Sequence, residues 1–216
     1  MRQSSAALNS EFRQTMKNKI LKKLFVPWWK MLIWISLPVI MFSCMNCRSM
    51  QSGTYVIKAG NHYCSGLNLP VIKFYWENPS VNFKYRIDDG AYAANNLNGV
   101  SKIYGFSEGQ HHWNSSARLG FIVKDNVITV RAYCYVDGVS PQQNEIQKPE
   151  IGTIETNRWY SCRISRQDGY YVFNHEGKEI KIKAGDGHSC GYLLTPYVGG
   201  TFTLDKDIRI DIELLP

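Results

Sequence analysis

From about residue 54 onward, hydrophobic and polar residues alternate in short runs that are separated by turn-forming residues. Each run has the length and the content of β-branched and aromatic residues typical of a β-strand. The expected strands are TYVIK, VIKFYW, NFKYRI, KIYGF, ARLGFIV, VITVRAYCYV, RWYSCRIS, YYVFN, KEIKIK, GYLLTPYV and DIRIDIELL. Suitable turn residues connect them at Asp88–Asp89–Gly90, Asp125–Asn126, Asp137–Gly138 and His175–Glu176–Gly177.

No stretch in this part of the sequence keeps an apolar period of 3.6 residues, so no long amphipathic helix is expected. A run of strands without intervening helices excludes a parallel βαβ architecture. We therefore expect residues 54–216 to form one all-β domain, a two-sheet antiparallel β-sandwich. Residues 139–150 contain two prolines and are expected to form a rim loop.

Residues 1–43 have a different character, because a basic stretch precedes a short apolar core. MKNKILKKLFVPWWK carries the positive charge, and MLIWISLPVIMF follows it. This core is shorter than the roughly 20 apolar residues that a membrane-spanning helix needs. The core ends at Ser43–Cys44, which resembles a bacterial lipoprotein signal, although Met41 departs from the usual Leu, Val or Ile at that position.

These features predict a signal segment over residues 1–43, a lipid on Cys44 and a short linker over residues 44–53. The domain would then be anchored to a membrane of the cell envelope, in the outer membrane or the periplasm. An uncleaved membrane anchor and ordinary secretion are the alternatives.

The net charge of +7 does not describe the domain. Residues 1–43 hold seven Lys or Arg and one acid, whereas residues 44–216 hold 18 Lys or Arg and 17 Asp or Glu. A nearly neutral domain lacks the positive charge that nucleic acid binding requires, so no nucleic acid partner is expected.

Five cysteines follow Cys44, and an oxidising compartment favours disulfides among them. Cys64 and Cys190 lie in polar, loop-like surroundings and form one candidate pair. Cys134 and Cys162 lie on the apolar faces of expected strands and form the other, with two buried free thiols as an equal alternative.

Two segments, HHWNSSARLGF and LLTPYVGGTFTLDKDIRIDI, resemble signatures of a group of bacterial envelope proteins. That group is similar to the concanavalin A-like jelly-roll superfamily, and the similarity covers about residues 70 to 216. The resemblance implies a lectin-like or glucanase-like sandwich. It leaves the function open, because this superfamily contains lectins, glycosidases and polysaccharide lyases.

The segment EGQHHWNSSARLGF raises the question of a metal site. His111 and His112 are adjacent, and neighbouring side chains of a strand point to opposite faces, so both rings cannot bind one metal ion from regular β structure. The other histidines lie in expected turns without carboxylates at ligand spacing. Neither a metal nor another cofactor is expected, and an ordinary hydrogen-bonded loop is the alternative interpretation of the segment.

Two enzymatic functions are compatible with a domain of this kind. Jelly-roll glucanases carry E-x-D-x-x-E along one strand, which is absent here; Asp211 and Glu213 share a face, but that alternation is typical of a solvent-facing sheet. Alginate-lyase-like sandwiches use a Q-x-H element, a paired-arginine strand and a tyrosine-rich strand. Gln110–His111–His112, Arg118 and Tyr170–Tyr171 resemble these parts, but no R-x-E-x-R strand is present.

Binding without catalysis demands less of the sequence. Tyrosine outnumbers phenylalanine about two to one after residue 43 and suits half-wet positions on a sugar-binding face. The candidate ligand-binding residues are His112, Trp113, Asn114, Arg118 and Tyr197, and no catalytic residue is assigned. We therefore expect a non-catalytic carbohydrate-binding lipoprotein whose partners are a glycan and a membrane. A lyase or hydrolase of the same fold and a protein-binding envelope subunit are the alternatives.

Overall fold

The protein is described from a computed structural model that covers residues 52–64, 72–74, 78–188, 190–201 and 203–216. All of these residues belong to one compact unit, residues 48–216. The expected signal segment and nearly all of the expected linker lie outside the described residues, so both stay predictions. Within the described part of the chain, no helix is long and apolar enough to span a membrane.

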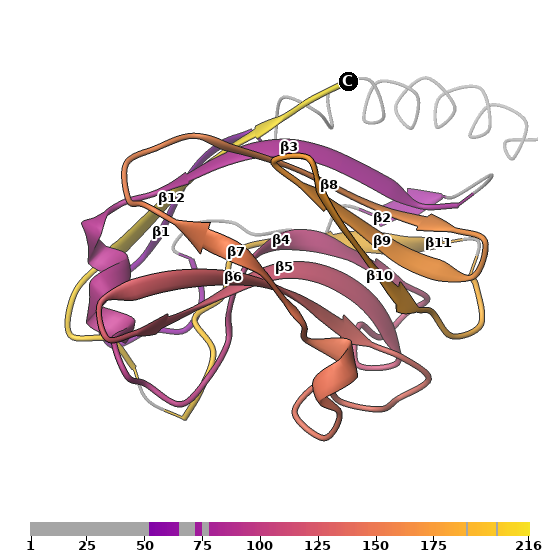
Figure 1. The fold of residues 1–216 in the computed structure, drawn as a ribbon, viewed down its shortest axis with the longest axis horizontal. Coiled ribbons are helices and arrows are strands. Elements are labelled where there is room, and N and C mark those ends of the chain that lie inside the picture. Colours follow the sequence, from indigo (N-terminus) through magenta and orange to yellow (C-terminus); the bar gives the residue numbers. More distant parts are fainter. Residues whose placement is uncertain (1–51, 65–71, 75–77, 189, 202) are drawn as a thin grey trace, which may run out of the picture. The chain divides into compact units, whose positions relative to one another are not determined.

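Two antiparallel sheets of six strands each stack face to face (Figure 1). Sheet A contains, in spatial order, β1 (Gly53–Ile57), β12 (Ile208–Leu214), β3 (Ser80–Ile87), β8 (Tyr160–Gln167), β9 (Tyr170–His175) and β10 (Lys178–Lys183). Sheet B contains β2 (Ile72–Phe74), β11 (Cys190–Leu194), β4 (Ser101–Glu108), β5 (Ser115–Lys124), β6 (Val127–Tyr135) and β7 (Glu150–Ile154). The expected two-sheet antiparallel sandwich is confirmed.

Short connections close most neighbouring strands. Asp125 and Asn126 adopt φ values of 50° and 60° between β5 and β6, and Glu176 and Gly177 adopt 50° and 82° between β9 and β10. Two consecutive residues with positive φ are the geometry of the tight hairpin turn that matches strand twist. Two 3₁₀ helices, η1 (Asp89–Ala94) and η2 (Glu145–Gln147), lie in longer connections.

Strand β7 is the element that the alternation pattern missed. Its sequence, EIGTI, is short and has Gly152 at its centre, which weakens the pattern of a strand. It pairs with β6 at the edge of sheet B, with a shift of register between Val130 and Arg131. The expected rim loop at residues 139–150 therefore contains η2 and ends in a strand.

The core lies between the two sheets and follows directly from alternation along each strand. In β5, Ala117, Leu119 and Phe121 are buried in it, while Arg118 and Gly120 face the opposite side. Large rings from both sheets dominate the core: Phe83, Tyr85, Tyr104, Phe106, Phe121, Tyr171 and Phe173. Burial of one such ring contributes about 1.5–3 kcal/mol to the free energy of folding.

One irregularity changes which residues of β4 face the core. Lys102 pairs with Gly120 of β5, but the next paired residue is Tyr104, opposite Leu119, so Ile103 is an extra residue in the ladder. Ile103 and Tyr104 are both fully buried. This β-bulge reverses the alternation, so that Lys102 faces away from the core although Tyr104, two residues later, faces into it.

A buried ion pair joins the two sheets inside the sandwich. The carboxylate of Glu108 in β4 accepts hydrogen bonds from Arg166 Nη1 of β8 at 2.7 Å and from the Tyr171 hydroxyl of β9 at 2.6 Å. Burial, and then the neighbouring Glu108 charge, raise the pKa of Tyr171 far above its usual range, so its hydroxyl remains a donor.

The two candidate disulfide pairs are not formed. The Cys64 thiol lies 3.9 Å from the hydroxyl of Thr195, which follows Cys190 by five residues along an extended segment. Five extended residues span roughly 16 Å, whereas disulfide-bonded Cα atoms lie within about 7 Å. Cys134 and Cys162 are free thiols packed in the core, which is the alternative arrangement that the sequence left open.

Candidate functional site

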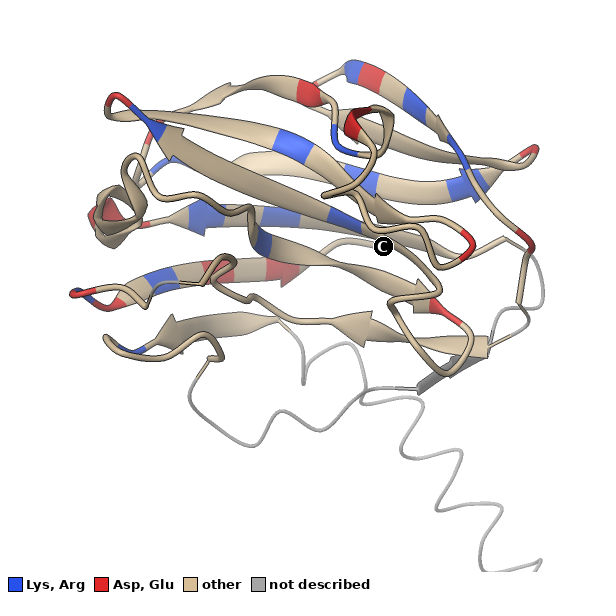
Figure 2. Cartoon of the chain, turned by 90° about the horizontal axis from the view of Figure 1, so that it is seen from below, with Lys and Arg blue, Asp and Glu red and all other residues tan. Residues whose placement is uncertain are grey.

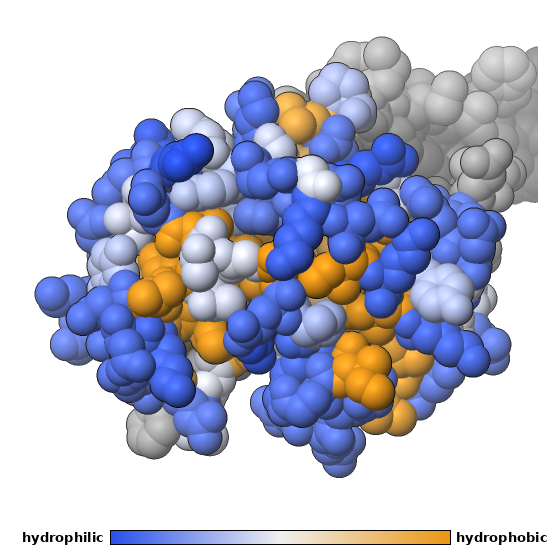
Figure 3. All heavy atoms as spheres, viewed as in Figure 1, coloured by the Kyte–Doolittle hydropathy of each residue, from blue (hydrophilic) through white to orange (hydrophobic). Residues whose placement is uncertain are grey.

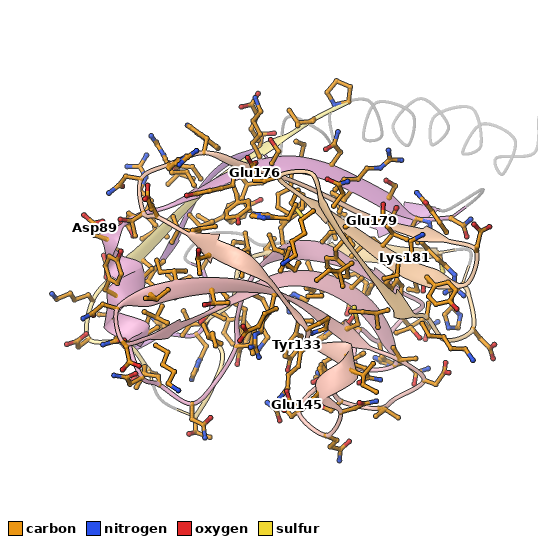
Figure 4. All side chains as sticks on the ribbon, viewed as in Figure 1. Asp89, Tyr133, Glu145, Glu176, Glu179 and Lys181 are labelled. Atoms are coloured by element: carbon orange, nitrogen blue, oxygen red, sulfur yellow. The ribbon has the colours of Figure 1, made fainter. Side chains whose placement is uncertain are left out.

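A groove of about 1340 Å³ lies on the face of sheet B that points away from sheet A. Side chains of β4, β5, β6 and β11 form its floor, and residues 96–100, 112–113 and 195–201 contribute to its walls. The connection that carries η2 contributes Gln142 and Lys148. In Figure 4, Tyr133 of β6 lies on this side of the sheet, close to Glu145 of η2, and Figure 3 shows that the surface is notched in this region.

The described lining of the groove contains no Asp or Glu but five positively charged residues: Lys102, Arg118, Lys124, Arg131 and Lys148. Two of these have acidic partners at the rim, because Arg131 pairs with Glu150 at 2.6 Å and Lys148 with Glu145 at 2.8 Å. Figure 2 shows a similar separation of charges beyond the groove: many lysines and arginines lie along the strands, and many aspartates and glutamates lie in turns.

Arg118 projects from β5 into the groove and is only 8% exposed. Its Nη2 donates to the carbonyl of Thr195 at 2.7 Å, and its Nε finds no acceptor among the described residues. Burial lowers the pKa of Arg118 to about 10, so the guanidinium remains charged at neutral pH. An unsatisfied buried donor costs about 1–3 kcal/mol, and a ligand oxygen would remove that cost.

Lys102 lies beside Arg118 on the same floor and is also 8% exposed. Its Nζ stands 4.6 Å from the centre of the Tyr133 ring and 5.2 Å from the centre of the Tyr197 ring. Burial, and then the charge of Arg118, lower the pKa of Lys102 to about 7. Neither Lys102 nor Arg118 forms an ion pair with any described residue, so near neutral pH the floor holds a charged guanidinium and a partly protonated amine, both without a counter-charge.

Gly199 makes room for this arrangement. A β-carbon at position 199 would lie 1.9 Å from the carbonyl oxygen of Val100 and 2.7 Å from Lys102 Nζ. Any side chain would therefore collide with the backbone beside the amine, and only glycine allows this close approach.

His112 forms a pair with Tyr192 at one end of the groove. The Nδ1 atom of His112 lies 2.9 Å from the Tyr192 hydroxyl, and the His112 backbone amide donates to the same oxygen at 3.3 Å. Burial, and then the charges of Arg118 and Lys102, lower the pKa of His112 to about 4. At neutral pH the imidazole is therefore uncharged and able to accept a proton.

Four of the five candidate ligand-binding residues line the groove: His112, Trp113, Arg118 and Tyr197. Asn114 is not among its lining residues. Its backbone amide donates to the His111 carbonyl, and its own carbonyl accepts from the Gly138 amide at 2.9 Å. Asn114 therefore shapes the loop that presents Trp113.

The sequence did not indicate the other lining residues, among them Lys102, Tyr133 and Tyr192. Regular alternation in KIYGF places Lys102 on the same face as the buried Tyr104, and the bulge that reverses this leaves no recognisable mark in the sequence. Tyr133 does have a signal, because alternation along β6 places it opposite the core residues Ala132 and Cys134.

The residues that suggested other chemistry lie elsewhere. Tyr171 points into the sandwich and binds Glu108, and Tyr170 beside it belongs to sheet A. Asp211 accepts hydrogen bonds from Thr54 at 2.6 Å and from Arg86 at 2.7 Å on sheet A. Burial raises the pKa of Asp211, but these bonds outweigh it and the net shift is downward. An ionised, well-satisfied carboxylate far from the groove does not suit a glycosidase acid.

A metal site finds no support in the described residues, where no three His, Cys, Asp or Glu side chains group closely enough to hold an ion. His62 shows why: its Nδ1 lies 2.8 Å from the carbonyl of Val198, and its ring stacks on Tyr197 at 5.6 Å. The histidine is used to build the groove wall.

No protein-family model matches the sequence, and a search of curated proteins finds no match. Solved structures do resemble it. The marine PL7 alginate lyase AlyA1 from Zobellia galactanivorans superposes with a TM-score of 0.52 at 13% identity, over 75% of this chain and 75% of that chain. An alginate lyase from Alteromonas sp. 272 gives a TM-score of 0.46 at 12% identity, over 76% and 87%. The carbohydrate-binding module CBM66 from Bacillus subtilis gives 0.34 at 9% identity, over 76% and 81%.

The likeness to AlyA1, with a TM-score above 0.5, shows the fold alone. The chain is an antiparallel jelly-roll β-sandwich, the fold that the resemblance of its two sequence segments implies. A fold of this kind hosts several chemistries, so the function has to be argued from the groove itself.

Proposed function

We propose that the groove on sheet B binds an anionic polysaccharide. The observation that carries this proposal is the pair of buried cationic groups, Lys102 and Arg118, on a floor whose described lining contains no acid. Leaving a buried charge without a partner costs several kcal/mol. A carboxylate on the ligand offsets this cost, and the planar guanidinium fork of arginine matches a carboxylate in two-pronged geometry.

The rest of the groove suits the sugar part of such a ligand. Tyr135 and Tyr192, both partly exposed, offer ring faces and hydroxyl groups along the floor, whereas the buried Tyr133 supports Lys102 from below. Ring faces pack on the C–H surfaces of sugars, and hydroxyls bind sugar oxygens. A neutral glycan would use the tyrosines but would leave both positive charges unmatched, so uronate-type sugars are the favoured class.

Binding can be measured by calorimetric titration of the full-length protein with alginate, polygalacturonate and neutral dextran. We expect both acidic polymers to bind, with an affinity that falls as salt is added, and dextran to show no binding. Arg118→Gln removes the guanidinium and should abolish most of the binding. Arg158→Gln is the matched control, because Arg158 is an exposed arginine in the connection before β8. Equal affinity for dextran and the acidic polymers would overturn the proposal.

A second candidate function is cleavage of the same polymer by β-elimination, which the His112–Tyr192 pair favours. Arg118 would neutralise the uronate carboxylate and so acidify the neighbouring C–H proton. The uncharged His112 imidazole would take that proton while the C=C bond forms and the glycosidic C–O bond breaks, and the Tyr192 hydroxyl would donate its proton to the leaving oxygen and recover one from His112. The contact between the two side chains, 2.9 Å, is the distance required for such a proton relay.

Turnover is tested by following the ultraviolet absorbance of the unsaturated uronate product. His112→Ala and Tyr192→Phe serve as variants, and Tyr170→Phe on sheet A is the control. Product formation that both groove variants abolish would establish the lyase function. Tight binding by the wild type without any product would leave the protein as a binding module.

We also propose that the domain acts at the cell envelope, held to the membrane by a lipid on Cys44. The supporting feature is the basic and apolar stretch that ends at Ser43–Cys44. Labelling of expressing cells with a fatty acid analogue tests this. Incorporation that Cys44→Ser eliminates is the expected result, and labelling that persists in this variant would contradict it.

A further inference from the structure

Two large aromatic side chains in the groove are exposed rather than packed. Tyr63, in the connection after β1, is 72% exposed, and Trp113, in the connection between β4 and β5, is 63% exposed. Rings of this size are normally buried, because leaving them in water forfeits the hydrophobic stabilisation that burial provides. The exposure of two such rings in the same groove indicates that they contact a ligand.

The two rings stand at different levels along β4. Trp113 follows His112, which binds Tyr192, and Tyr192 exchanges hydrogen bonds with Ser107 of β4. At the other level, Tyr63 forms a bridge with Tyr197.

Tyr197 in turn exchanges backbone hydrogen bonds with Lys102, at 2.7 and 3.0 Å. Lys102 and Ser107 are five residues apart in the same strand, which corresponds to roughly 16 Å at about 3.3 Å per residue. The two aromatic side chains are therefore anchored at opposite ends of the groove floor.

The wall that carries Tyr63 is rigidly built. The Tyr63 ring meets the Tyr197 ring edge-on, with centroids 5.0 Å apart and an interplanar angle of 71°. The other neighbour of Tyr197 is His62, stacked at 5.6 Å and 17°. A backbone bond from the Val198 amide to the His62 carbonyl, at 2.9 Å, holds this connection against the chain after β11. Tyr63 is thus presented to solvent in a fixed position.

We propose that Tyr63 and Trp113 are two sugar-stacking platforms, and that the groove binds an extended acidic chain across several successive sugar units. Each ring packs against the C–H face of one unit. Arg118 and Lys102 bind the carboxylates of units between the two rings. This inference rests on the proposed function and deepens it, because it identifies the ligand as a linear polyuronate rather than a single acidic sugar.

The arrangement argues against an apolar peptide as the occupant. An apolar strand or helix would cover the rings but would bury the charges of Lys102 and Arg118 without a partner, at a cost of several kcal/mol. A chain that alternates C–H faces with carboxylates matches both the rings and the charges.

The test is a length series of alginate oligosaccharides, from the disaccharide to the octasaccharide, titrated into the full-length protein. For the wild type we expect affinity to rise with length until the chain spans both rings, and then to level off. Tyr63→Ala should lower the affinity of the long oligosaccharides about three- to tenfold and leave that of the shortest ones unchanged. Tyr63→Phe keeps the ring and should behave as the wild type does.

Tyr170→Ala is the matched control, since Tyr170 is an exposed tyrosine on sheet A, outside the groove lining. Equal affinity of the wild type and Tyr63→Ala for every length would overturn this inference alone. An affinity that is already maximal at the disaccharide would do the same. Failure of the wild type to bind any acidic oligosaccharide or polymer would overturn the proposed function and this inference together.

Discussion

Arg166 and Arg118 are two largely buried arginines on the inner and the outer side of sheet B, respectively. Arg166 of β8 points between the sheets, where Glu108 and the carbonyl of Gly185 accept its hydrogen bonds. Arg118 of β5 points away from the core, donates to one carbonyl and leaves Nε without a described acceptor. The two side chains are similarly buried, but Arg166 has a charged hydrogen-bond partner inside the protein and Arg118 does not.

The contrast separates scaffold from site in physical terms. A buried charge that has its counter-charge inside the protein is compensated without a ligand, although Glu108 Oε1 itself has no described hydrogen-bond partner. A buried charge without one keeps its desolvation cost until a partner arrives. We infer that the unmatched cationic groups of sheet B mark the binding face, and that the matched pair between the sheets fixes how they pack.

The largest effect should come from breaking the matched pair. Arg166→Gln leaves the fully buried Glu108 carboxylate uncompensated, so we expect the free energy of unfolding to fall by about 3–5 kcal/mol. Urea denaturation measures this. The double variant Glu108→Gln with Arg166→Met should recover part of the loss. A loss of less than about 1 kcal/mol, as for an exposed ion pair, would contradict the comparison.

Arg118→Gln should show the opposite profile. Removal of an unmatched buried charge should leave the free energy of unfolding unchanged or higher, whereas the affinity for an acidic polysaccharide should fall at least about tenfold, or about 1.4 kcal/mol. Parallel urea denaturation and calorimetric titration separate the two effects. A variant that loses stability but keeps its affinity would place Arg118 in the scaffold.

The pH dependence of binding isolates Lys102. Its protonated form, which binds anions, predominates below a pKa of about 7, so affinity should be highest on the acid side and fall as pH rises through 7. The decline should approach tenfold per pH unit. The two groups near it keep their charge state around neutral pH, since His112 has a pKa of about 4 and Arg118 of about 10.

Lys102→Met is the control for this titration. The variant should bind weakly at every pH and give a flat profile, because it lacks the amine whose pKa is lowered to about 7. The same decline in the wild type and in Lys102→Met would assign the titration to the ligand or to another group.

The smallest effect concerns the exposed rings. Trp113→Ala should weaken binding by about 0.5–1.5 kcal/mol, which is a few-fold change in Kd. Trp159→Ala serves as the control, because Trp159 is an exposed tryptophan that packs against Arg86 outside the groove. Loss of affinity in both variants to the same degree would remove the distinction between the two faces.

Alternation in the sequence was sufficient to predict the sandwich and part of the site. The pattern ARLGFIV places Arg118 opposite the core residues Leu119 and Phe121, and the structure has it there. His112 and Trp113 were recognisable as candidate binding residues because they belong to a cluster of bulky and polar residues directly before that strand. These features are local, and local patterns are what a sequence displays.

The rest depended on contacts between distant segments. Lys102 is a groove residue only because of the bulge, and it is paired with Tyr197, which is far away in the sequence. The polar surroundings of Cys64 and Cys190 favoured a disulfide between them. In the structure, Cys64 lies beside Thr195, which follows β11, whereas Cys190 lies at the start of that strand. Strand register and bulges are set by tertiary packing, which no local pattern encodes.

The bulge at Ile103 also has an evolutionary meaning. With Ile103 deleted, Lys102 opposite Gly120 and Tyr104 opposite Leu119 would be neighbours in a regular ladder, so the amine would still face the groove. Loss of the bulge with Ile103 retained would instead shift the register and turn the amine toward the apolar interior. A homologous sandwich can therefore keep a lysine on this face with or without the extra residue, provided that the pairing of this position with the neighbouring strand is retained.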